Sequence, residues 1–434
     1  MHRLLDYLFH LKGNETTVRR ELLAGTVSFF TMVYIVVVNS SILADAGIPL
    51  EAGIVATVLA SVTGCLLMAV WANRPLLLVP GMGINALFAY TLVHSMGLSW
   101  QEALAAVFTA GIVFAVVSFT PLAHVISSAI PRSLKEAITA GIGLFLAFIG
   151  LQKGGVIILD QETFVALGPL SSPQILLTIF TLLLTLVLFL RQVPGSFLIS
   201  IAAGTLLTAL AGQIDTDGLN QSSSFSLASY DSVFAALSFE RVGSVTFWIA
   251  AFSIALVVIF ESIGVIHSQL QLLGKPESLS AAMRASAVSV ITCGLWGTSP
   301  TVSAAESVAG ISAGGKTGLT SLTTGLLFLL SLLLLPVVTL IPESAIAPVL
   351  VVVGGLMMQG VRHLPFDDLS EWFPAFLTIA LIPLTYSIVD GMGFGFVAYP
   401  LLKWLLGKGR DVSVPLYVIA GLFVVYFGLQ AVGV

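Results

Sequence analysis

Long apolar runs, separated by short polar stretches, make up most of this 434-residue chain. An α-helix crosses the hydrocarbon core of a bilayer with about 20 apolar residues. Fourteen runs reach that length or fall slightly short of it, and each predicts one span. They are residues 24–44, 51–71, 79–95, 101–120, 134–151, 173–190, 195–212, 245–268, 281–296, 298–312, 317–336, 345–361, 372–388 and 391–407. The pattern therefore predicts an all-α polytopic membrane protein with 14 transmembrane spans. A C-terminal apolar segment, residues 413–434, fits either a further span or a surface helix.

The basic residues predict the orientation of these spans. With the N-terminus inside, all of the 17 Lys and Arg residues except Lys153 and Arg241 fall on the inner side. This distribution satisfies the positive-inside rule for a protein of the cell (inner) membrane with a cytoplasmic N-terminus. Residues 1–23 alternate apolar and charged positions, which predicts an amphipathic segment at the cytoplasmic interface.

Composition excludes several other classes of protein. Hydrophobic residues make up 57% of the chain and charged residues 9%, whereas a soluble protein carries about 25% charged residues. The net charge of −5 is spread over the loops and indicates no nucleic-acid partner. Cys65 and Cys293 lie in separate apolar runs, which predicts neither a disulfide nor a metal site. From its composition we therefore expect the chain to lie in a lipid bilayer.

The third and tenth spans are interrupted in the same way. Pro80 and Pro300 each remove a backbone donor and favour extended geometry before them. Residues 76–80 and 297–300 are therefore predicted to be extended, with half-helices beginning near Gly83 and Val302. Backbone of this kind is tolerated in a membrane only inside protein or along a cavity. The alternative is a pair of Pro-kinked, tightly packed helices.

Matching motifs indicate an internal repeat. The run Gly141–Leu146 in span 5 resembles residues 353–358 in span 12, and spans 3 and 10 form a second matched pair. Seven spans separate the members of each pair, so the second copy enters the membrane from the opposite side. A 7+7 inverted repeat with paired broken spans is typical of secondary transporters.

Two carboxylates stand inside apolar spans. Glu261 lies in span 8 and Glu306 in span 10, and a carboxylate at the bilayer centre costs about 2.5–3.5 kcal/mol. We expect them to form one polar site that binds substrate and couples its transport to protons. The alternative for each is a neutral, structural acid.

Four further residues are candidates for the same site. Gly83 and Ala305 are small enough to let a flat ligand reach the backbone. Asn85 follows the break in span 3, and Asn39 occupies the position in span 1 that corresponds to Glu261 in the repeat. Asn39 fits equally well as a hydrogen-bonding link between helices.

Other polar residues suggest weaker hypotheses. His267 and His94 fit either a proton relay or the ends of their spans. The run Gly310–Thr317 has the Gly-x4-Gly-Lys-Thr spacing of a phosphate loop, but it joins two predicted spans and follows no predicted strand, so the resemblance is superficial. No His-Glu-x-x-His motif is present, and the pattern does not indicate an intramembrane enzyme.

Three motifs carry a resemblance to a known family. They are Gly81–Ala86, Ser133–Gly150 and Glu306–Thr320, and the likeness extends from Thr17 to about Phe427. The chain resembles the AzgA-like purine permeases, a branch of the nucleobase–cation/ascorbate symporters. The resemblance implies proton-coupled import of purine bases, with the acids of spans 8 and 10 binding the base and no other cofactor.

The resemblance also implies a division into domains. A core domain would contain residues 24–130 and 245–340, and a gate domain residues 131–212 and 341–412, with an extracellular linker at 213–244. Transport would follow alternating access by an elevator-like movement of core against gate. Assembly as a homodimer is compatible with this fold.

Two departures affect the expected substrate. The branch usually has Asp at position 261 and Asn-Pro where this chain has Asn39-Ser40. The run Phe260–Gly264 looks more like the xanthine/uracil branch. We therefore expect guanine and hypoxanthine first, adenine second, and xanthine or uracil third. An anion transporter on the same fold, or a channel, is the rival hypothesis.

Overall fold

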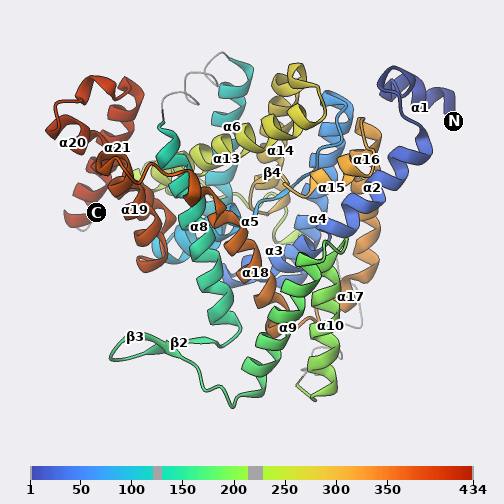
Figure 1. The fold of residues 1–434 in the computed structure, drawn as a ribbon, viewed down its shortest axis with the longest axis horizontal. Helices are drawn as coiled ribbons and strands as arrows, with labels where there is room; N and C mark the ends of the chain where they lie inside the picture. Colours follow the sequence, from blue (N-terminus) through green and yellow to red (C-terminus); the bar gives the residue numbers. More distant parts are fainter. Residues whose placement is uncertain (1, 121–129, 214–227, 433–434) are drawn as a thin grey trace.

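The computed structural model of the protein consists almost entirely of helices and describes residues 2–120, 130–213 and 228–432 (Figure 1). Within those ranges, ten helical segments are long and apolar enough to cross a membrane. They are Val18–Asp45, Leu50–Ala72, Trp100–Phe119, Arg132–Lys153, Pro173–Leu190, Val245–Leu272, Pro276–Trp296, Gly318–Val338, Glu343–His363 and Val414–Ala431. Ser196–Leu210 and Leu369–Leu384 are shorter apolar helices. The predicted all-α polytopic architecture is confirmed.

The helices pack into two groups. The first contains α2 (Val18–Met32), α3 (Tyr34–Asp45), α4 (Leu50–Leu67), α6 (Trp100–Phe119), α13 (Val245–Leu272), α14 (Leu279–Trp296) and α16 (Gly318–Ser331). The second contains α8 (Arg132–Lys153), α9 (Pro173–Leu190), α10 (Ser196–Leu210), α18 (Glu343–Met357), α19 (Leu369–Leu384), α20 (Ile388–Leu405) and α21 (Val414–Val432). Helices contact members of their own group more extensively than members of the other.

Two short extended segments cross in the middle of the first group. The strand β1 (Leu78–Pro80) pairs antiparallel with β4 (Thr301–Ser303), with Val79 opposite Val302. After β1 the chain continues as α5 (Met82–Ala86) and the π-helix η3 (Leu87–Ser95), and after β4 as α15 (Ser307–Ser312). Both interrupted spans therefore contain extended backbone, as the sequence predicts.

The second break lies later in the chain than expected. The extended segment is Thr301–Ser303, not residues 297–300, and its half-helix begins at Ser307, not near Val302. The reason is the end of α14, where Gly297 adopts a φ of +83° that favours glycine. Residues 298–300 are then used to turn the chain back, and the ladder with β1 begins only at Thr301.

The chain ends and loops differ from expectation at two places. Helix α1 (His2–Phe9) agrees with the amphipathic segment expected over residues 1–23, but α2 already begins at Val18, where Thr17 caps it by accepting from the N–H of Arg20. The loop 152–172 contains a hairpin that the pattern did not predict, formed by β2 (Ile157–Asp160) and β3 (Phe164–Leu167).

The predicted linker 213–244 is only partly described, because residues 214–227 lie outside the described ranges. Its later part begins with the short helix α12 (Ala228–Asp231) and packs on the first group. Val233 is fully buried against Gly297, and the Tyr230 hydroxyl donates to the Trp296 carbonyl at 3.1 Å. This part of the linker is therefore an ordered cover over the end of α14.

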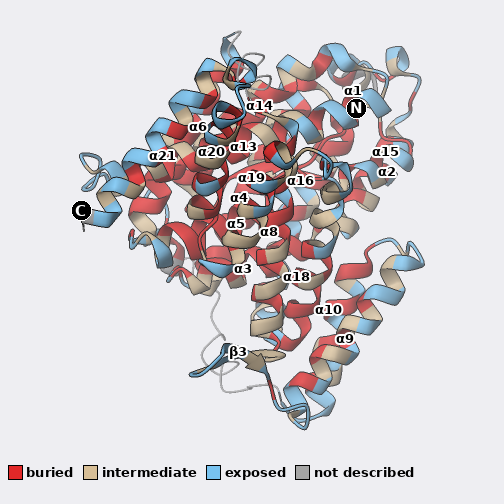
Figure 2. Cartoon of the chain, turned by 60° about the vertical axis from the view of Figure 1, so that its left-hand side comes forward, coloured by how far each residue is buried: buried red, intermediate tan, exposed pale blue. Residues whose placement is uncertain are grey.

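Burial follows the membrane environment (Figure 2). Buried residues occupy the interior of the main body, whereas α9 and α10 extend away from it with many exposed residues. The exposed residues of α9 include Leu183 and Leu190, at 57% and 77%. Apolar side chains exposed over a whole helix face suit contact with lipid. The structure is that of a multi-pass membrane protein.

Candidate functional site

A cavity of about 530 Å³ lies between the two helix groups. Its first wall comes from α13 and from the segments on either side of the β1–β4 crossing, and its second wall from α8 and α18. Among its lining residues are Val79, Gly81, Gly83, Phe260, Glu261, Val302, Ala305 and Glu306 from the first wall, and Arg132, Lys135, Ile142, Val353 and Met357 from the second. The size is within the range of about 300–1,000 Å³ that small-molecule pockets occupy.

Both predicted acids line this cavity. Glu261 extends from α13, and one of its carboxyl oxygens lies 3.8 Å from where a Cβ on Gly81 would stand. Glu306 immediately precedes α15 and lines the same cavity. The structure therefore brings together two acids that are 45 positions apart in the sequence.

The acids differ in their hydrogen bonds. The hydroxyl of Tyr34, on α3, donates to Oε1 of Glu306 at 2.7 Å. Among the described residues, no hydrogen bond to the carboxyl group of Glu261 is found. Glu306 is thus held in place by the protein, while Glu261 keeps both oxygens available to a ligand or a proton.

Gly83 and Ala305 also line the cavity. A Cβ on Gly83 would stand 2.7 Å from Cγ2 of Ile142, so glycine lets α5 approach α8 closely. Ala305 is exposed towards the cavity beside the β4–α15 turn. Within the described ranges, no backbone carbonyl accepts from the N–H groups of Ala305 and Glu306. These two groups are therefore available as donors at the cavity wall.

Asn39 and Asn85 lie behind the cavity and not on its surface. Both are fully buried, and the hydroxyl of Ser299 donates to the side-chain oxygen of each, at 3.1 and 2.7 Å. Asn39 also donates to the hydroxyls of Thr57 and Thr298. This network ties α3, α4 and α5 to the segment that leads into β4. It places Asn39 where the hypothesis of a link between helices would put it.

The amide nitrogen of Asn85 is an exception in this network, because it is buried without a hydrogen-bond partner among the described residues. Buried polar groups are usually paired, since an unpaired donor costs about 1–3 kcal/mol. Asn85 lies two residues after Gly83, on the half-helix that borders the cavity.

Sequence reasoning missed several residues of the site. Tyr34 lies within the apolar run 24–44, and a phenol in the middle of a span is a signal that a polar partner is needed. Gln269 was also missed: its amide donates to the Ala304 carbonyl at 2.6 Å and accepts from the Ser303 hydroxyl at 2.8 Å. Gln269 therefore fixes β4 to α13, the helix that carries Glu261.

The second wall adds charges that the sequence did not connect with the site. Arg132, Lys135 and Glu136 come from the first turns of α8. The Arg132 guanidinium lies 3.4 Å from the Glu136 carboxylate, and the Lys135 ammonium lies 5.2 Å from the ring centre of Phe260. One end of the cavity is thus lined by charged side chains.

The two histidines lie away from the cavity. His267 is exposed near the end of α13 and contacts the Gln271 side chain at 2.9 Å. His94 is near the end of η3, where its Nε2 lies 2.8 Å from the Asp45 carbonyl oxygen. Among the described residues, no group of three or more His, Cys, Asp or Glu side chains is arranged to hold a metal ion.

Comparison with known proteins identifies the family. The Xan_ur_permease model, described as a permease family, matches residues 19–393. The chain belongs to this permease family. The nucleobase transporter PlAzg2 of Paenibacillus larvae is 52% identical over 88% of this chain and 77% of its own length. The guanine/hypoxanthine permease PbuO of Bacillus subtilis is 39% identical over 96% and 98%, and the adenine permease AdeP of Escherichia coli is 35% identical over 97% and 95%.

These relatives confirm the resemblance to the AzgA-like branch, and they are permeases, so the chain is a transporter and not an enzyme. Solved structures with the same fold include the transmembrane domain of the cyanobacterial bicarbonate transporter BicA. That domain has a TM-score of 0.66 and 15% identity, and the match covers 87% of this chain and 97% of that chain. A second is SLC26A9, with a TM-score of 0.65 and 13% identity over 89% and 66%. At such low identity the likeness concerns the fold alone.

Proposed function

We propose that this permease is a proton-coupled symporter that imports purine nucleobases, with guanine and hypoxanthine preferred over adenine. The observation that carries the proposal is the single cavity in which Glu261, Glu306 and two small residues, Gly83 and Ala305, meet. Relatives that match nearly the whole chain are named as guanine/hypoxanthine and adenine permeases.

The chemistry of the cavity suits a flat heterocycle with N–H donors. The two carboxylates accept hydrogen bonds from the ring N–H groups of the base. The N–H groups of Ala305 and Glu306 donate to its carbonyl oxygen. Guanine and hypoxanthine carry both an N1–H donor and a carbonyl at position 6, whereas adenine lacks that carbonyl. A site that hydrogen-bonds a substrate group discriminates strongly against analogues lacking it.

Proton coupling is assigned to the two glutamates, with Glu261 as the main carrier. An acid buried without a donor or a cation costs less when it carries a proton. Glu261 is half-buried and has no hydrogen-bond donor among the described residues, while Glu306 is held by Tyr34. One proton that crosses a potential of 100 mV supplies about 2.3 kcal/mol, which corresponds to roughly 50-fold accumulation of a neutral base.

We further propose 14 spans arranged as a 7+7 inverted repeat, with the first helix group as core and the second as gate. The antiparallel pairing of β1 with β4 supports the repeat, since inverted copies must run in opposite directions. The cavity between the groups supports alternating access by an elevator-like movement. The distribution of Lys and Arg supports a cytoplasmic N-terminus in the cell membrane. Homodimer formation remains a prediction.

Uptake measurements test the proposed function. Cells that lack their own nucleobase carriers, expressing this chain, should accumulate radiolabelled hypoxanthine. Unlabelled guanine should compete most strongly, adenine less, and xanthine and uracil least. Competition by uracil or xanthine alone would indicate a permease of the xanthine/uracil type. Uptake of labelled bicarbonate in place of any base would favour the rival hypothesis of an anion transporter.

A further inference from the structure

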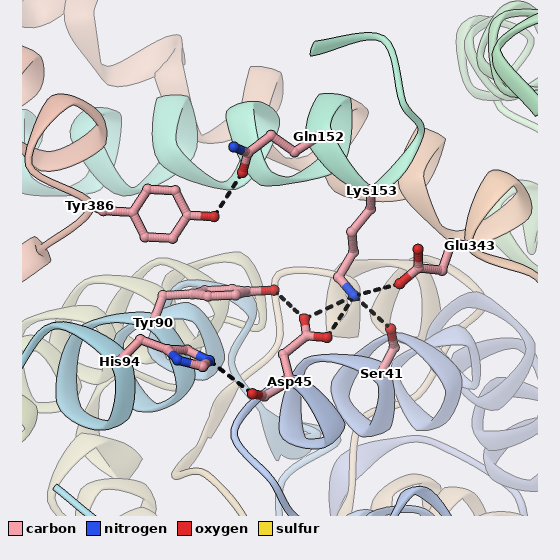
Figure 3. A network of polar contacts seen from close by, with 8 residues as sticks. All are labelled: Ser41, Asp45, Tyr90, His94, Gln152, Lys153, Glu343 and Tyr386. Carbon is pink, nitrogen blue, oxygen red and sulfur yellow. Dashed lines mark hydrogen bonds and ion pairs between the residues drawn. The ribbon is translucent and has the colours of Figure 1, made fainter. Parts of the chain in front are cut away.

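A polar network connects the last turn of α8 with α3 and α18 (Figure 3). It lies at the opposite end of α8 from Arg132 and Lys135, which line the cavity. Lys153 is the last residue of α8, and its ammonium lies 3.0 and 2.8 Å from the two carboxylate oxygens of Asp45. It also lies 3.0 Å from Glu343 and 3.3 Å from the Ser41 hydroxyl. The Lys153 side chain is only 10% exposed, so these four oxygens replace most of its water.

The partners of Lys153 come from different helix groups. Asp45 and Ser41 lie on α3, in the first group, whereas Glu343 begins α18, in the second group with Lys153 itself. The Tyr90 hydroxyl, from η3 of the broken span, donates to Asp45 at 2.5 Å. The contacts from Lys153 to Asp45 and Ser41 therefore cross the interface, while the contact from Lys153 to Glu343 stays within the second group. Tyr90 bonds to Asp45 from η3, which packs against α3 and α6 of the first group.

Aromatic contacts reinforce the same end of the interface. The rings of Tyr90 and Tyr386 are nearly perpendicular, with centres 5.8 Å apart, and Phe145 lies 5.0 Å from Tyr386. The Tyr386 hydroxyl donates to the Gln152 side chain at 2.7 Å, one residue before Lys153. The N–H of Ile388, the first residue of α20, also donates to the hydroxyl of Thr91 on η3 at 2.9 Å.

The cavity lies towards the other end of α8. Arg132 and Lys135, from its first turn, line the cavity, and Gln152 and Lys153, from its last turn, do not. The 22 residues of α8 span about 33 Å. Ionic and aromatic contacts therefore occupy the interface at the last turn of α8. The cavity, with its charged lining residues, occupies the interface at the first turn of α8.

We propose that Asp45 and Lys153 form a latch that holds the transporter in the state whose cavity faces the first turn of α8. This inference rests on the proposed alternating access of core against gate. When the groups separate, Asp45 moves away with α3. Lys153 then keeps Glu343, and Asp45 keeps Tyr90, so neither charge is left without a partner. Separation of a buried ion pair is strongly unfavourable only when one charge is left unpaired. The latch therefore releases reversibly.

The two carboxylates that bind Lys153 provide a matched pair of variants. Asp45→Asn removes the charge that crosses the interface and keeps a group that bonds to Tyr90. Glu343→Gln removes a charge that stays within the gate group. If Asp45 and Lys153 form a latch, only Asp45→Asn should release the resting conformation. If the ion pairs merely stabilise the fold, Asp45→Asn and Glu343→Gln should change the resting conformation equally. Lys153→Met should behave like Asp45→Asn, and Lys153→Arg should retain the latch.

The experiment measures which side of the membrane reaches the cavity. Thr139 lines the cavity from α8, and both native cysteines are fully buried, so a Thr139→Cys reporter can be labelled selectively. A membrane-impermeant maleimide is applied to inside-out and to right-side-out vesicles without substrate. In the Asp45→Asn and Lys153→Met backgrounds, we expect the ratio of inside to outside labelling to fall about tenfold. Glu343→Gln and Lys153→Arg should leave the ratio within about twofold of the parent.

The possible outcomes separate the latch from the proposed function. Labelling needs no substrate, so a tenfold change without hypoxanthine uptake supports the latch and rejects nucleobase transport. Uptake by the parent together with equal labelling in Asp45→Asn and Glu343→Gln overturns the latch. If Asp45→Asn does not reach the membrane, the labelling ratio of Lys153→Met tests the latch instead. An unchanged ratio in that variant also overturns the proposal.

Discussion

At the scale of single residues, the two acids in the cavity have different surroundings. Glu306 is held by the hydroxyl of Tyr34, and Glu261 lies opposite Gly81 without a protein donor in the described chain. The membrane makes both acids costly, so their shared cavity is the strongest argument that they serve transport. Two predictions belong to this scale.

Glu261→Gln should abolish the accumulation of radiolabelled hypoxanthine, because the amide can neither take up a proton nor present two acceptor oxygens. Membrane expression should stay normal, since glutamine has the same shape. The control is Glu277→Gln, whose side chain is 64% exposed. Full accumulation at normal apparent affinity in Glu261→Gln would remove this residue from the site.

Tyr34→Phe should raise the KM for hypoxanthine about tenfold or more, because a hydrogen bond to a charged group contributes about 1.5–3 kcal/mol and its loss frees the Glu306 side chain. Initial uptake rates over a range of concentrations give the value. Tyr7→Phe is the control, since Tyr7 is 79% exposed on α1. Equal KM values for the two variants would show that Tyr34 does not position Glu306.

At the scale of elements, glycines set how closely the helices approach. In α8 and α18, the helices that the proposed repeat relates, Gly143 and Gly354 face each other. A Cβ on Gly354 would stand 2.3 Å from the Gly143 carbonyl oxygen, and a Cβ on Gly143 would stand 2.5 Å from the Gly354 carbonyl oxygen. Backbone contact of this kind is how membrane helices pack without a hydrophobic driving force between them.

Gly354→Val should therefore destabilise the detergent-solubilised protein by about 1–3 kcal/mol or more, because the side chain has no space against α8. The next residue provides the control: a Cβ on Gly355 would meet nothing within 4 Å. Thermal unfolding followed by loss of monodisperse protein measures the difference. Comparable midpoints for Gly354→Val and Gly355→Val would contradict the close contact of these helices.

At the scale of the whole molecule, the separation into two helix groups with a cavity between them suits a carrier. A carrier coupled to protons accumulates substrate only while the proton gradient lasts. In the proposed mechanism the gradient acts through Glu261 and Glu306, which line the cavity between the groups.

A protonophore should thus reduce hypoxanthine accumulation from roughly 50-fold, the value for one proton at 100 mV, to equilibration. Counterflow of labelled against unlabelled base should continue, since exchange needs no net driving force. Filter assays on energised vesicles measure both. Accumulation that persists at the same ratio after protonophore treatment would exclude proton coupling.

The sequence by itself determined the membrane class, the helical architecture, the interruption of spans 3 and 10 and the family. Each depends on local composition or on spacing along the chain. Twenty apolar residues specify a helix in lipid wherever it packs, and proline disrupts a helix wherever it occurs. The same local chemistry singled out Glu261 and Glu306, because a carboxylate in an apolar run is costly without knowledge of its neighbours.

Only the tertiary structure decided which polar groups meet. Nothing near Tyr34 in the chain indicates Glu306, and nothing near Lys153 indicates Asp45, because these partners come from distant helices. The proposed repeat pairs Asn39 with Glu261, yet Asn39 does not line the cavity and instead bonds to Ser299. The position of α15 also depends on tertiary contacts, because pairing with β1 makes β4 begin at Thr301. Contacts between remote segments depend on how the whole chain packs, and the local pattern does not contain that information.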